Sequence, residues 1–530
     1  MSMYELCLLD CQSIQQYVFG SNKLRTNIGA SANVAAIFKK TLQQFLPDNC
    51  DITIWHESPG DIRIFGDSSL DCEAGYIGGG NALLIFKMDE KHSLAQEFLN
   101  KWSRNLLLKY PGIVPAAAVH ELENKNKGDE ITKSELDTLF RKLAVEKNKS
   151  VPVTVLPRHG ITAECKQTGL SAEIFDKEEK RPSQWVSSVS KAKIDAAAEK
   201  AKHADRLAFN EEQLGQIEAK NHIAVVHIDG NSMGKQFMDC RNLGERRRLS
   251  SAVEKRTDAA WKTVKEKFEK EYDYLWKNKI IKKQFDDNEK VVWPFREIIL
   301  NGDDLTFICN ARLAFWLTEL FLQELAAKPL NFKNEKLRDS KDDEIRMSAC
   351  AGIAFVKTKF PFYRAYNLAE ELCGSAKTKG REQKQSWVDF EIVYGGLSGD
   401  LEQIREKKYS IGNNTLISRP WRMLDEKGNT ANISHEDWAC LKKSAREFTS
   451  QDEQGKSKWP RSKRKELLLR LARGLESFKD YEVALNARNL HLDFDCGIEP
   501  QGWQKLRFYY DTLQVSEFYP DYLLKGGKNG

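Results

Sequence analysis

The sequence predicts an α+β protein that contains the same strand-and-helix core twice, followed by helical segments. Two observations carry this prediction. An apolar strand that ends in an acidic residue occurs twice, as residues 4–10 (YELCLLD) and 222–229 (HIAVVHID). Each copy is followed by two short apolar runs joined by a glycine-containing turn, residues 74–86 and 297–308, which is the pattern of a β-hairpin. An internal repeat of this kind determines the architecture more strongly than any single element.

The elements after the two hairpins also agree in order. Each hairpin precedes an amphipathic helix, whose apolar positions are Leu94, Phe98, Trp102 and Leu106 in the first copy and Leu313, Leu317, Phe321 and Leu325 in the second. Then come a strand of small residues (113–119 and 348–356), a further helix (134–144 and 362–377) and a last strand (151–155 and 387–393). With a helix after each first strand, the order β-α-β-β-α-β-α-β is a ferredoxin-like core with one extra strand.

The remaining segments complete a division into four parts. The region between the copies is charged and predicts a helix from Ser190 to Glu211, and the C-terminal region reads as helical, most clearly at 467–472. No long Gly/Ser-rich or Pro-rich linker separates the parts, so we expect them to pack directly on one another. The predicted parts are residues 1–160 (first core), 161–220 (charged helical linker), 221–400 (second core) and 401–530 (C-terminal helical domain).

Composition excludes several classes of protein. Lys and Arg total 82 against 77 Asp and Glu, a net charge of only +5, which argues against a protein that coats duplex nucleic acid but allows a local anion pocket. No apolar run approaches the ~20 residues of a membrane span, and no signal peptide is visible. The 11 cysteines form no C-x-x-C pair, which is typical of reduced thiols in a cytoplasmic protein.

The second copy carries the residues that predict chemistry. Asp229 ends its first strand, and the following turn, 230–235, opens a helix; a carboxylate there can hold a cation, and the start of a helix favours a phosphate. We expect the hairpin turn to bring one or both of Asp303 and Asp304 beside Asp229, because the first strand and the hairpin are neighbours in this fold. Clustered carboxylates are hard ligands for Mg²⁺ or Mn²⁺ bridging to phosphates. Lys377, near the end of a later helix, can reach an anionic triphosphate.

A purely structural interpretation exists for the turn alone, since Asn-Gly is a strong hairpin signal and aspartates often follow it on a surface. The ordered set of acids, helix-opening turn and lysine within one repeat favours a site instead. The first copy has Gly80-Asn81 where the second has Asp303-Asp304. We therefore expect the first copy to be a degenerate core without catalysis of its own.

These motifs resemble a known family, the large palm-domain subunit of type III CRISPR effector complexes, which is the synthetase of cyclic oligoadenylates. The segments that carry the resemblance are Ser21–Arg25 with Gly29–Ser31, Asp229–Lys235, the variant GGDD motif Asn301–Asp304, Phe360–Ala365 leading to Ala369–Leu372 and Ala376–Lys377, and Ser418–Trp421 at the start of the C-terminal helical domain. The resemblance implies two palm domains, a fold shared with nucleotide cyclases and GGDEF-like enzymes.

The resemblance also implies an activity, nucleotidyl transfer between ATP molecules in antiviral defence, with two Mg²⁺ or Mn²⁺ ions held by Asp229, Asp303 and Asp304. The implied nucleotide-binding residues are Gly230, Asn231, Ser232, Gly234, Lys235, Gly302 and Lys377, with Ser348 and Cys350 where the family reads adenine. The implied partners are ATP, other effector subunits and guide or target RNA, and no membrane.

Three departures from the family pattern change these expectations. The chain begins at the first palm and contains no His-Asp dipeptide, so we expect no nuclease activity of the HD type. The family often has a zinc-binding segment between the palms. Here Cys165 stands alone with Thr168 where a second cysteine would be, and because a structural zinc site needs four ligands, none is expected. Asn301 replaces the first glycine of the turn, a mild change because Asn tolerates the left-handed conformation.

Other readings remain open. The chain could be a non-catalytic scaffold that binds guide RNA, or a cyclic-dinucleotide, diguanylate or purine nucleotide cyclase on the same palm. The basic run 456–465 could contact RNA with Trp459 stacking on a base, although a solvated loop is the simpler reading. The triplet 435–437 is read as the cap region of a helix after Ser434 and not as a metal site.

Overall fold

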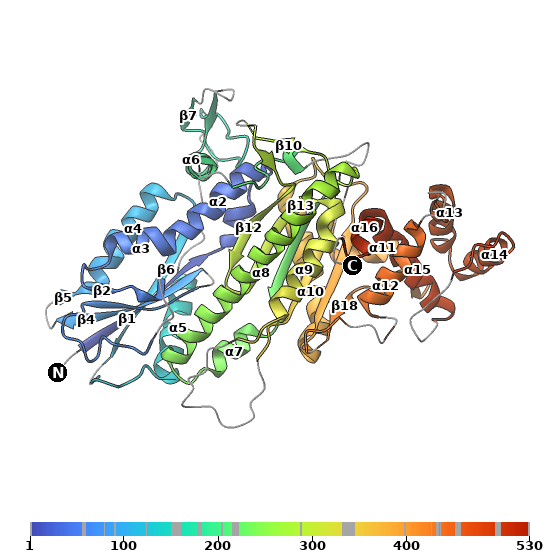
Figure 1. Ribbon diagram of the computed structural model, residues 1–530. Helices are drawn as coiled ribbons and strands as arrows, with labels where there is room; N and C mark the ends of the chain where they lie inside the picture. Colours follow the sequence, from blue (N-terminus) through green and yellow to red (C-terminus); the bar gives the residue numbers. More distant parts are fainter. Residues whose placement is uncertain are drawn as a thin grey trace.

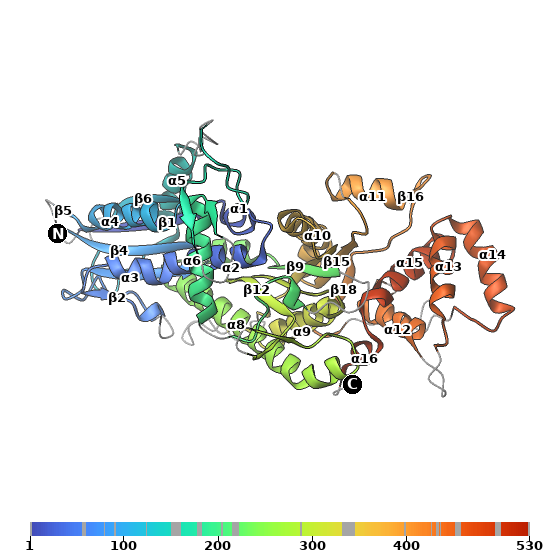
Figure 2. The same cartoon turned by 90° about the horizontal axis from the view of Figure 1, so that it is seen from above.

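The computed structural model describes residues 3–55, 60–78, 80–89, 92–122, 125–149, 161–177, 183–202, 205–214, 222–286, 289–330, 345–396, 399–425, 427–430, 434, 436–450, 457–492 and 500–527. The first palm, the second palm and the C-terminal helices follow one another along the molecule, blue, green to yellow, and orange to red in Figure 1. Figure 2 shows the same order from above. None of the described helices combines the length and the apolar character required to cross a membrane.

The first palm is a sheet in the order β2-β3-β4-β1-β6, with β5 pairing at β4. Its strands are β1 (Met3–Gln12), β2 (Cys50–Asp51), β3 (Cys72–Gly78), β4 (Asn81–Asp89), β5 (His92–Ser93) and β6 (Val114–Leu122). Its helices are α1 (Ile14–Phe19), α2 (Leu24–Ala36), α3 (Leu42–Phe45), α4 (Leu94–Lys109) and α5 (Lys133–Lys149), with a π-helical turn (Ile37–Thr41) joining α2 to α3. The last strand predicted for this copy, 151–155, lies outside the described residues.

The second palm is a sheet in the order β12-β13-β9-β14-β15-β18. Its strands are β9 (His222–Gly230), β12 (Phe295–Asn301), β13 (Asp304–Asn310), β14 (Ala349–Lys357), β15 (Ser386–Ile392) and β18 (Trp421–Leu424), with a separate ribbon of β10 (Gln284–Phe285) and β11 (Val291–Val292). Its helices are α7 (Met233–Asp239), α8 (Leu243–Lys277), α9 (Ala314–Ala326) and α10 (Phe362–Gln383). The order β12-β13-β9-β14 repeats β3-β4-β1-β6, which confirms the predicted pair of ferredoxin-like cores.

The linker between the palms contains β7 (Ile174–Asp176), β8 (Gln184–Val186) and α6 (Ser188–Lys202). The predicted extension of this helix to Glu211 is wrong. The buried guanidinium of Arg296 donates hydrogen bonds to the carbonyl oxygens of Leu207 and Ala208 and also binds the carboxylate of Asp205. These contacts hold the segment after residue 205 along the second palm. Its carbonyl oxygens accept hydrogen bonds from Arg296 and not from the N–H groups of a helix.

The palm motif around Gly29 has a packing role. A Cβ atom at Gly29 would lie 1.8 Å from the carbonyl oxygen of Lys193 in α6, so only glycine lets the two helices cross at this distance. Next to it, the Ser31 hydroxyl donates a hydrogen bond to the carbonyl oxygen of Ile298 in β12. The motif therefore joins the first palm to both the linker and the second palm.

The two palms share a buried interface along α8. Arg247 of α8 pairs with Glu73 of β3 at 2.6 Å between Nη1 and Oε1, with both side chains at most 1% exposed. The second oxygen of Glu73 accepts hydrogen bonds from the backbone N–H groups of Arg63 and Ile64 at 2.8 and 2.9 Å. On the other side of the interface, Phe19 stacks on Tyr366 of α10 with 3.7 Å between ring centroids.

The C-terminal region is mostly helical but completes the second palm. Its elements are α11 (Leu401–Tyr409), β16 (Ser410–Ile411), β17 (Asn414–Thr415), α12 (Trp438–Thr449), α13 (Arg461–Leu471), α14 (Leu475–Asn486), α15 (Gly502–Phe518) and α16 (Asp521–Leu524). Trp421 was expected to begin a helical domain, but it begins β18, which pairs antiparallel with β15. The sheet of the second palm thus continues past the domain boundary predicted at residue 400; the other predicted boundaries stay predictions.

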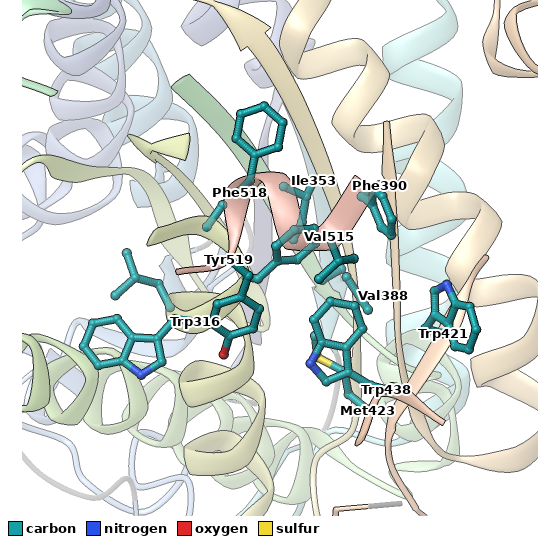
Figure 3. Close-up of a cluster of buried hydrophobic side chains, with 14 of the residues drawn as sticks. Trp316, Ile353, Val388, Phe390, Trp421, Met423, Trp438, Val515, Phe518 and Tyr519 are labelled. Atoms are coloured by element: carbon teal, nitrogen blue, oxygen red, sulfur yellow. The ribbon is translucent and has the colours of Figure 1, made fainter. Parts of the chain in front are cut away.

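A buried polar contact fixes the Ser418–Trp421 motif. The carboxylate of Asp511 in α15 accepts hydrogen bonds from the backbone N–H groups of Ser418 and Arg419 at 2.9 and 3.0 Å and from the indole of Trp421 at 3.1 Å. Apolar side chains close the same junction: Figure 3 shows Tyr519 between Trp316 and Trp438, with 6.4 Å between the rings of Tyr519 and Trp438. The helical region and the second palm therefore share one core.

Two smaller predictions have different outcomes. The helix cap after Ser434 is confirmed, since α12 begins at Trp438 and the N–H of Ser434 donates to the carboxylate of Asp437, the N-cap residue, at 2.7 Å. The solvated loop at the basic run is wrong in its second half, because Arg461 to Lys465 form the first turn of α13. Trp459 is 6% exposed and packs on Phe448, so it is not available for stacking on RNA.

Candidate metal and nucleotide site

Three carboxylates converge at one end of the second palm sheet. Asp229 lies near the end of β9, and Asp303 and Asp304 lie at the turn between β12 and β13. Leu305 pairs with Ile228 in the register of β13 and β9, so that the residues one step further on, Asp304 and Asp229, meet at the same edge. One ligand oxygen from each of the three acids lies within 4.8 Å of the others. This donor set of hard oxygens fits Mg²⁺ or Mn²⁺.

Two glycines make room for this arrangement. Gly302 has φ +59°, the left-handed conformation that the tight turn requires. At Gly230 a Cβ atom would lie 2.6 Å from Oδ2 of Asp303, so the missing side chain lets the Asp303 carboxylate lie over the end of β9. Gly230 was expected to contact the nucleotide; in the structure, the space that a side chain would fill there is occupied by the Asp303 carboxylate.

The cluster carries excess negative charge. Removal from water and the neighbouring Asp229 carboxylate raise the pKa of Asp303, and the same causes raise the pKa of Asp304 well above its usual range. Lys377 of α10 supplies one compensating charge: its buried ammonium forms an ion pair with Asp229 and donates to the carbonyl oxygen of Gly230 at 3.2 Å. One ammonium among three carboxylates leaves a site that favours a divalent cation.

Two residues predicted to bind nucleotide are buried and contact other protein groups instead. Asn231 is 4% exposed, and its amide donates hydrogen bonds to the Ser348 hydroxyl at 3.1 Å and to the carbonyl oxygen of Gln385 at 2.8 Å. Cys350 is fully buried in a cluster with Cys373 and other side chains of α10 and β15. A thiol without exposed surface cannot read a base in this structure, so the expectation for Cys350 is corrected; Ser348 is half-buried at the same edge.

The helix-opening turn remains accessible. Ser232 has φ 57° and occupies the N-cap position of α7, with no side-chain cap hydrogen bond. Gly234 and Lys235 are exposed at the first turn of α7. Of the predicted nucleotide-binding residues, these three therefore lie at the surface beside the acidic cluster.

The first palm repeats part of the site. Asp10 of β1 stands opposite Asn81 in the sheet register, where the second palm has an acid, and it forms an ion pair with Lys147 of α5. This pair is the counterpart of Asp229 and Lys377. Lys147 was not among the predicted site residues, although both copies of the repeat have a lysine in the corresponding helix, Lys147 in α5 and Lys377 in α10.

The hairpin turns of both palms line one cavity of about 120 Å³. Gly80 and Asn81 of the first turn and Asn301 of the second contribute to its wall. Gly80 has φ +82°, and a Cβ atom there would lie 2.4 Å from Cδ1 of Ile14. The positive φ therefore favours glycine at this position, whereas the terminal methyl of Ile14 could move away from a Cβ atom; Gly79 lies outside the described residues.

The linker contains a small polar cluster around Cys165, where the resemblance raised the question of a zinc site. Cys165 and Ser190 lie 3.3 Å apart between Sγ and Oγ, and the hydroxyls of Thr168 and Ser187 lie 3.0 Å apart. Hydrogen bonds from Ser190 and Thr168 lower the pKa of the Cys165 thiol to about 6, against the opposing effect of burial. One thiol and three hydroxyls do not fit structural zinc, which binds thiolate and imidazole ligands.

Comparison with known proteins agrees with this description. Residues 222–386 match the family model of the Cas10/Cmr2 second palm domain. A chain from the crystal structure of the Csm1–Csm4 cassette in complex with pppApA superposes with a TM-score of 0.51 at 14% identity, covering 98% of this chain and 69% of that chain. No curated protein matches the chain in sequence.

Two further crystal structures match equally well. The Csm1–Csm4 subcomplex of the type III-A CRISPR-Csm interference complex gives a TM-score of 0.51 at 14% identity, with 97% of this chain and 69% of the other covered. The Csm1–Csm4 cassette in complex with one ATP gives a TM-score of 0.51 at 14% identity, with 97% and 70% covered. The family match confirms the resemblance for the second palm, and the structural likeness shows that nearly the whole chain has this fold.

Proposed function

We propose that this chain is a nucleotidyltransferase that joins ATP molecules into cyclic or linear oligoadenylates in its second palm. The observation that carries the proposal is the convergence of Asp229, Asp303 and Asp304 within a segment that matches a Cas10/Cmr2 palm domain. A palm that served only as a scaffold would have no need for repelling carboxylates. Similar chains come from structures solved with ATP and pppApA, which supports ATP as the substrate and a role with partner subunits in an RNA-guided antiviral complex.

Each residue of the site has a distinct task in this proposal. Asp229, Asp303 and Asp304 would hold two Mg²⁺ or Mn²⁺ ions, which when bound activate a ribose hydroxyl and stabilise the leaving pyrophosphate. Lys377 limits the repulsion among the acids, and Lys235 at the start of α7 offers an exposed cation to the triphosphate. The protein contributes mainly position and charge, as phosphoryl-transfer chemistry requires.

Product analysis tests this function. The purified protein is incubated with each nucleoside triphosphate and Mn²⁺ or Mg²⁺, alone and with partner subunits and target RNA, and the products are identified by mass spectrometry. We expect oligoadenylates and pyrophosphate from ATP. Cyclic dinucleotides would identify a dinucleotide cyclase, and no product under any of these conditions would identify a scaffold.

The first palm is expected to contribute no catalysis. Asp10→Asn should leave turnover within about threefold, because Asn81 stands where a second acid would be and Asp10 only pairs with Lys147. The matched variant Asp229→Asn, at the equivalent position of the repeat, should lose turnover by at least about 100-fold. Initial rates of pyrophosphate release measure both. An equally deep loss in folded Asp10→Asn protein would show that both palms are catalytic.

Synthesis should require only one chain. The hairpin turns of both palms line one cavity, and Asn301 in its wall begins the turn that carries Asp303 and Asp304, although the acids themselves do not line it. A second ATP bound between the palms would then present its hydroxyl to the acidic cluster of the same molecule. The cavity must widen, because nucleotide-sized ligands occupy about 300 Å³ or more. The rate per chain should therefore not depend on protein concentration where light scattering reports a monomer. A total rate that rises with the square of concentration would place the second ATP on another chain.

A further inference from the structure

A basic face of α13 lines a cavity of about 480 Å³ at the junction of the C-terminal helices and the second palm. Arg461, Arg464 and Lys465 contribute to its wall and stand at i, i+3 and i+4 spacing on the helix, so they share one face. Other parts of the wall come from α15, from His222 at the start of β9 and from the 3-10 helix Ala311–Leu313. This cavity is separate from the acidic cluster, whose residues do not line it.

Charges in the cavity are out of balance. Its two acids already have partners in the protein: Glu517 accepts a hydrogen bond from the Tyr394 hydroxyl at 2.6 Å, and Asp521 pairs with Lys525 at 2.5 Å. By contrast, none of the three cations on α13 forms an ion pair with any residue in the described part of the chain. The buried Nε of Arg464 also lacks a hydrogen-bond partner there.

The positive charges of α13 repel one another. Burial and the positive charge of Arg461 lower the pKa of Arg464, while the carboxylate of Glu517 in the same wall acts in the opposite direction. A fourth cation, Arg312, is fixed at the wall because its guanidinium donates hydrogen bonds to the carbonyl oxygens of Lys279 and Ile280 at 2.9 and 3.2 Å. A bound anion would relieve the repulsion between Arg461 and Arg464 and accept a hydrogen bond from the buried Nε of Arg464.

The rest of the wall is apolar. Leu468 of α13, Leu513 of α15 and Phe518 line the cavity, and the ring of His222 lies edge-on to Phe518 with 5.4 Å between centroids. A volume of this size accommodates one nucleotide, since small-ligand pockets occupy about 300–1,000 Å³. The cavity therefore combines phosphate-binding cations with an apolar surface suited to a base or a ribose.

We propose that this cavity binds a nucleoside phosphate, with the phosphate on Arg461, Arg464 and Lys465 and the nucleoside on the apolar wall. The ligand would be one nucleotide of a single-stranded RNA or a free nucleotide, which present the same chemistry. The proposal goes beyond the function proposed for the acidic cluster and does not depend on it.

The test measures binding to the full chain in EDTA, which keeps divalent ions out of the acidic cluster. The probes are a labelled single-stranded RNA of about ten nucleotides, read by fluorescence anisotropy, and AMP and ATP, read by calorimetry. The test variant is Arg461→Ala/Arg464→Gln/Lys465→Ala. The matched control, Arg470→Ala/Arg473→Ala/Lys479→Ala, removes three cations that do not line the cavity: Arg470 near the end of α13, Arg473 in the turn after it and Lys479 in α14.

We expect the test variant to weaken RNA binding at least about tenfold. The slope of log K against the logarithm of the salt concentration should become shallower by about two, as the loss of three phosphate contacts on a single strand predicts. The control should change Kd less than about twofold. Loss of RNA binding without measurable AMP or ATP binding identifies RNA as the ligand, and loss of all three identifies a nucleotide site.

Equal affinities of the two variants, or no binding to the unmodified chain, would overturn the proposal. If the triple variant does not fold, Lys465→Glu replaces it, because the charge of this exposed side chain can be reversed without loss of packing. In protein with an unchanged melting temperature, that single reversal must weaken RNA binding several-fold; an unchanged Kd would count equally against the site.

Discussion

Replacing both Asp303 and Asp304 by alanine is expected to abolish ATP turnover, by more than about 1,000-fold, while the protein stays folded. The change removes two of the three carboxylates that converge at the sheet edge. Both are half-buried at an open turn, so their loss creates no cavity in the core. Pyrophosphate release and mass spectrometry of products measure the effect. Product formation at the unmodified rate would remove the catalytic assignment of the cluster.

The same double variant has a second readout that does not depend on activity. Burial and mutual repulsion raise the pKa values of both acids, so these charges destabilise the metal-free protein. We therefore expect the melting temperature of the variant in EDTA to equal or exceed that of the unmodified protein. Mn²⁺ should raise the melting temperature of the unmodified protein only, because a ligand stabilises the state that binds it. A lower melting temperature in EDTA would show that the acids support the fold.

Breaking the buried ion pair between the palms is expected to cost the most stability. Glu73→Ala leaves the guanidinium of Arg247 buried without its partner and removes the acceptor for two backbone N–H groups. Loss of one partner of a buried pair costs about 3–5 kcal/mol. Chemical denaturation followed by circular dichroism measures the loss, and turnover should fall with it because the palms no longer hold a fixed geometry.

A matched control lies on the same interface. Lys39 and Glu254 also join the first palm to α8, at 3.3 Å, but with side chains 60% and 35% exposed. Lys39→Ala should cost less than about 1 kcal/mol, as exposed pairs do. The double variant Glu73→Leu/Arg247→Met should recover only part of the loss of Glu73→Ala, since apolar side chains of similar volume can replace the buried pair but leave the backbone N–H groups of Arg63 and Ile64 without their acceptor. Equal losses in the free energy of unfolding for Glu73→Ala and Lys39→Ala would show that burial does not determine how much an ion pair contributes to the stability of this interface.

Much of the fold could be predicted because its signals are local and repeated. Strand and helix periodicities, the two hairpin turns and the order of elements appear twice in the chain, and the structure has both copies. The acidic cluster followed from the fold, since strand order alone places the end of β9 beside the β12–β13 turn. Gly29 and Gly230 stood out as parts of sequence motifs, but the structural need for glycine at each was not predictable. At Gly29 two helices cross, and at Gly230 the Asp303 carboxylate lies over the end of β9.

Errors arose where a residue's partner lies far away in the sequence. The end of α6 depends on Arg296, and the placement of Ser418–Trp421 depends on Asp511 of α15. Cys350 and Trp459 had suitable chemistry for a ligand, but packing removed both from the surface. Lys147 was overlooked because its role becomes apparent only when it meets Asp10 across the first palm.

The two palm cores, the asymmetry between them and the three acids of the second palm could be read from local sequence, because backbone periodicity and strand order are encoded by neighbouring residues. Three features depend on the folded molecule: which of the predicted ligand-binding residues are accessible, which charged groups form ion pairs, and how the cations of α13 come to line a cavity. Burial and ion pairing depend on side chains brought together from distant segments, and their free energies are set by that packing and not by the local sequence.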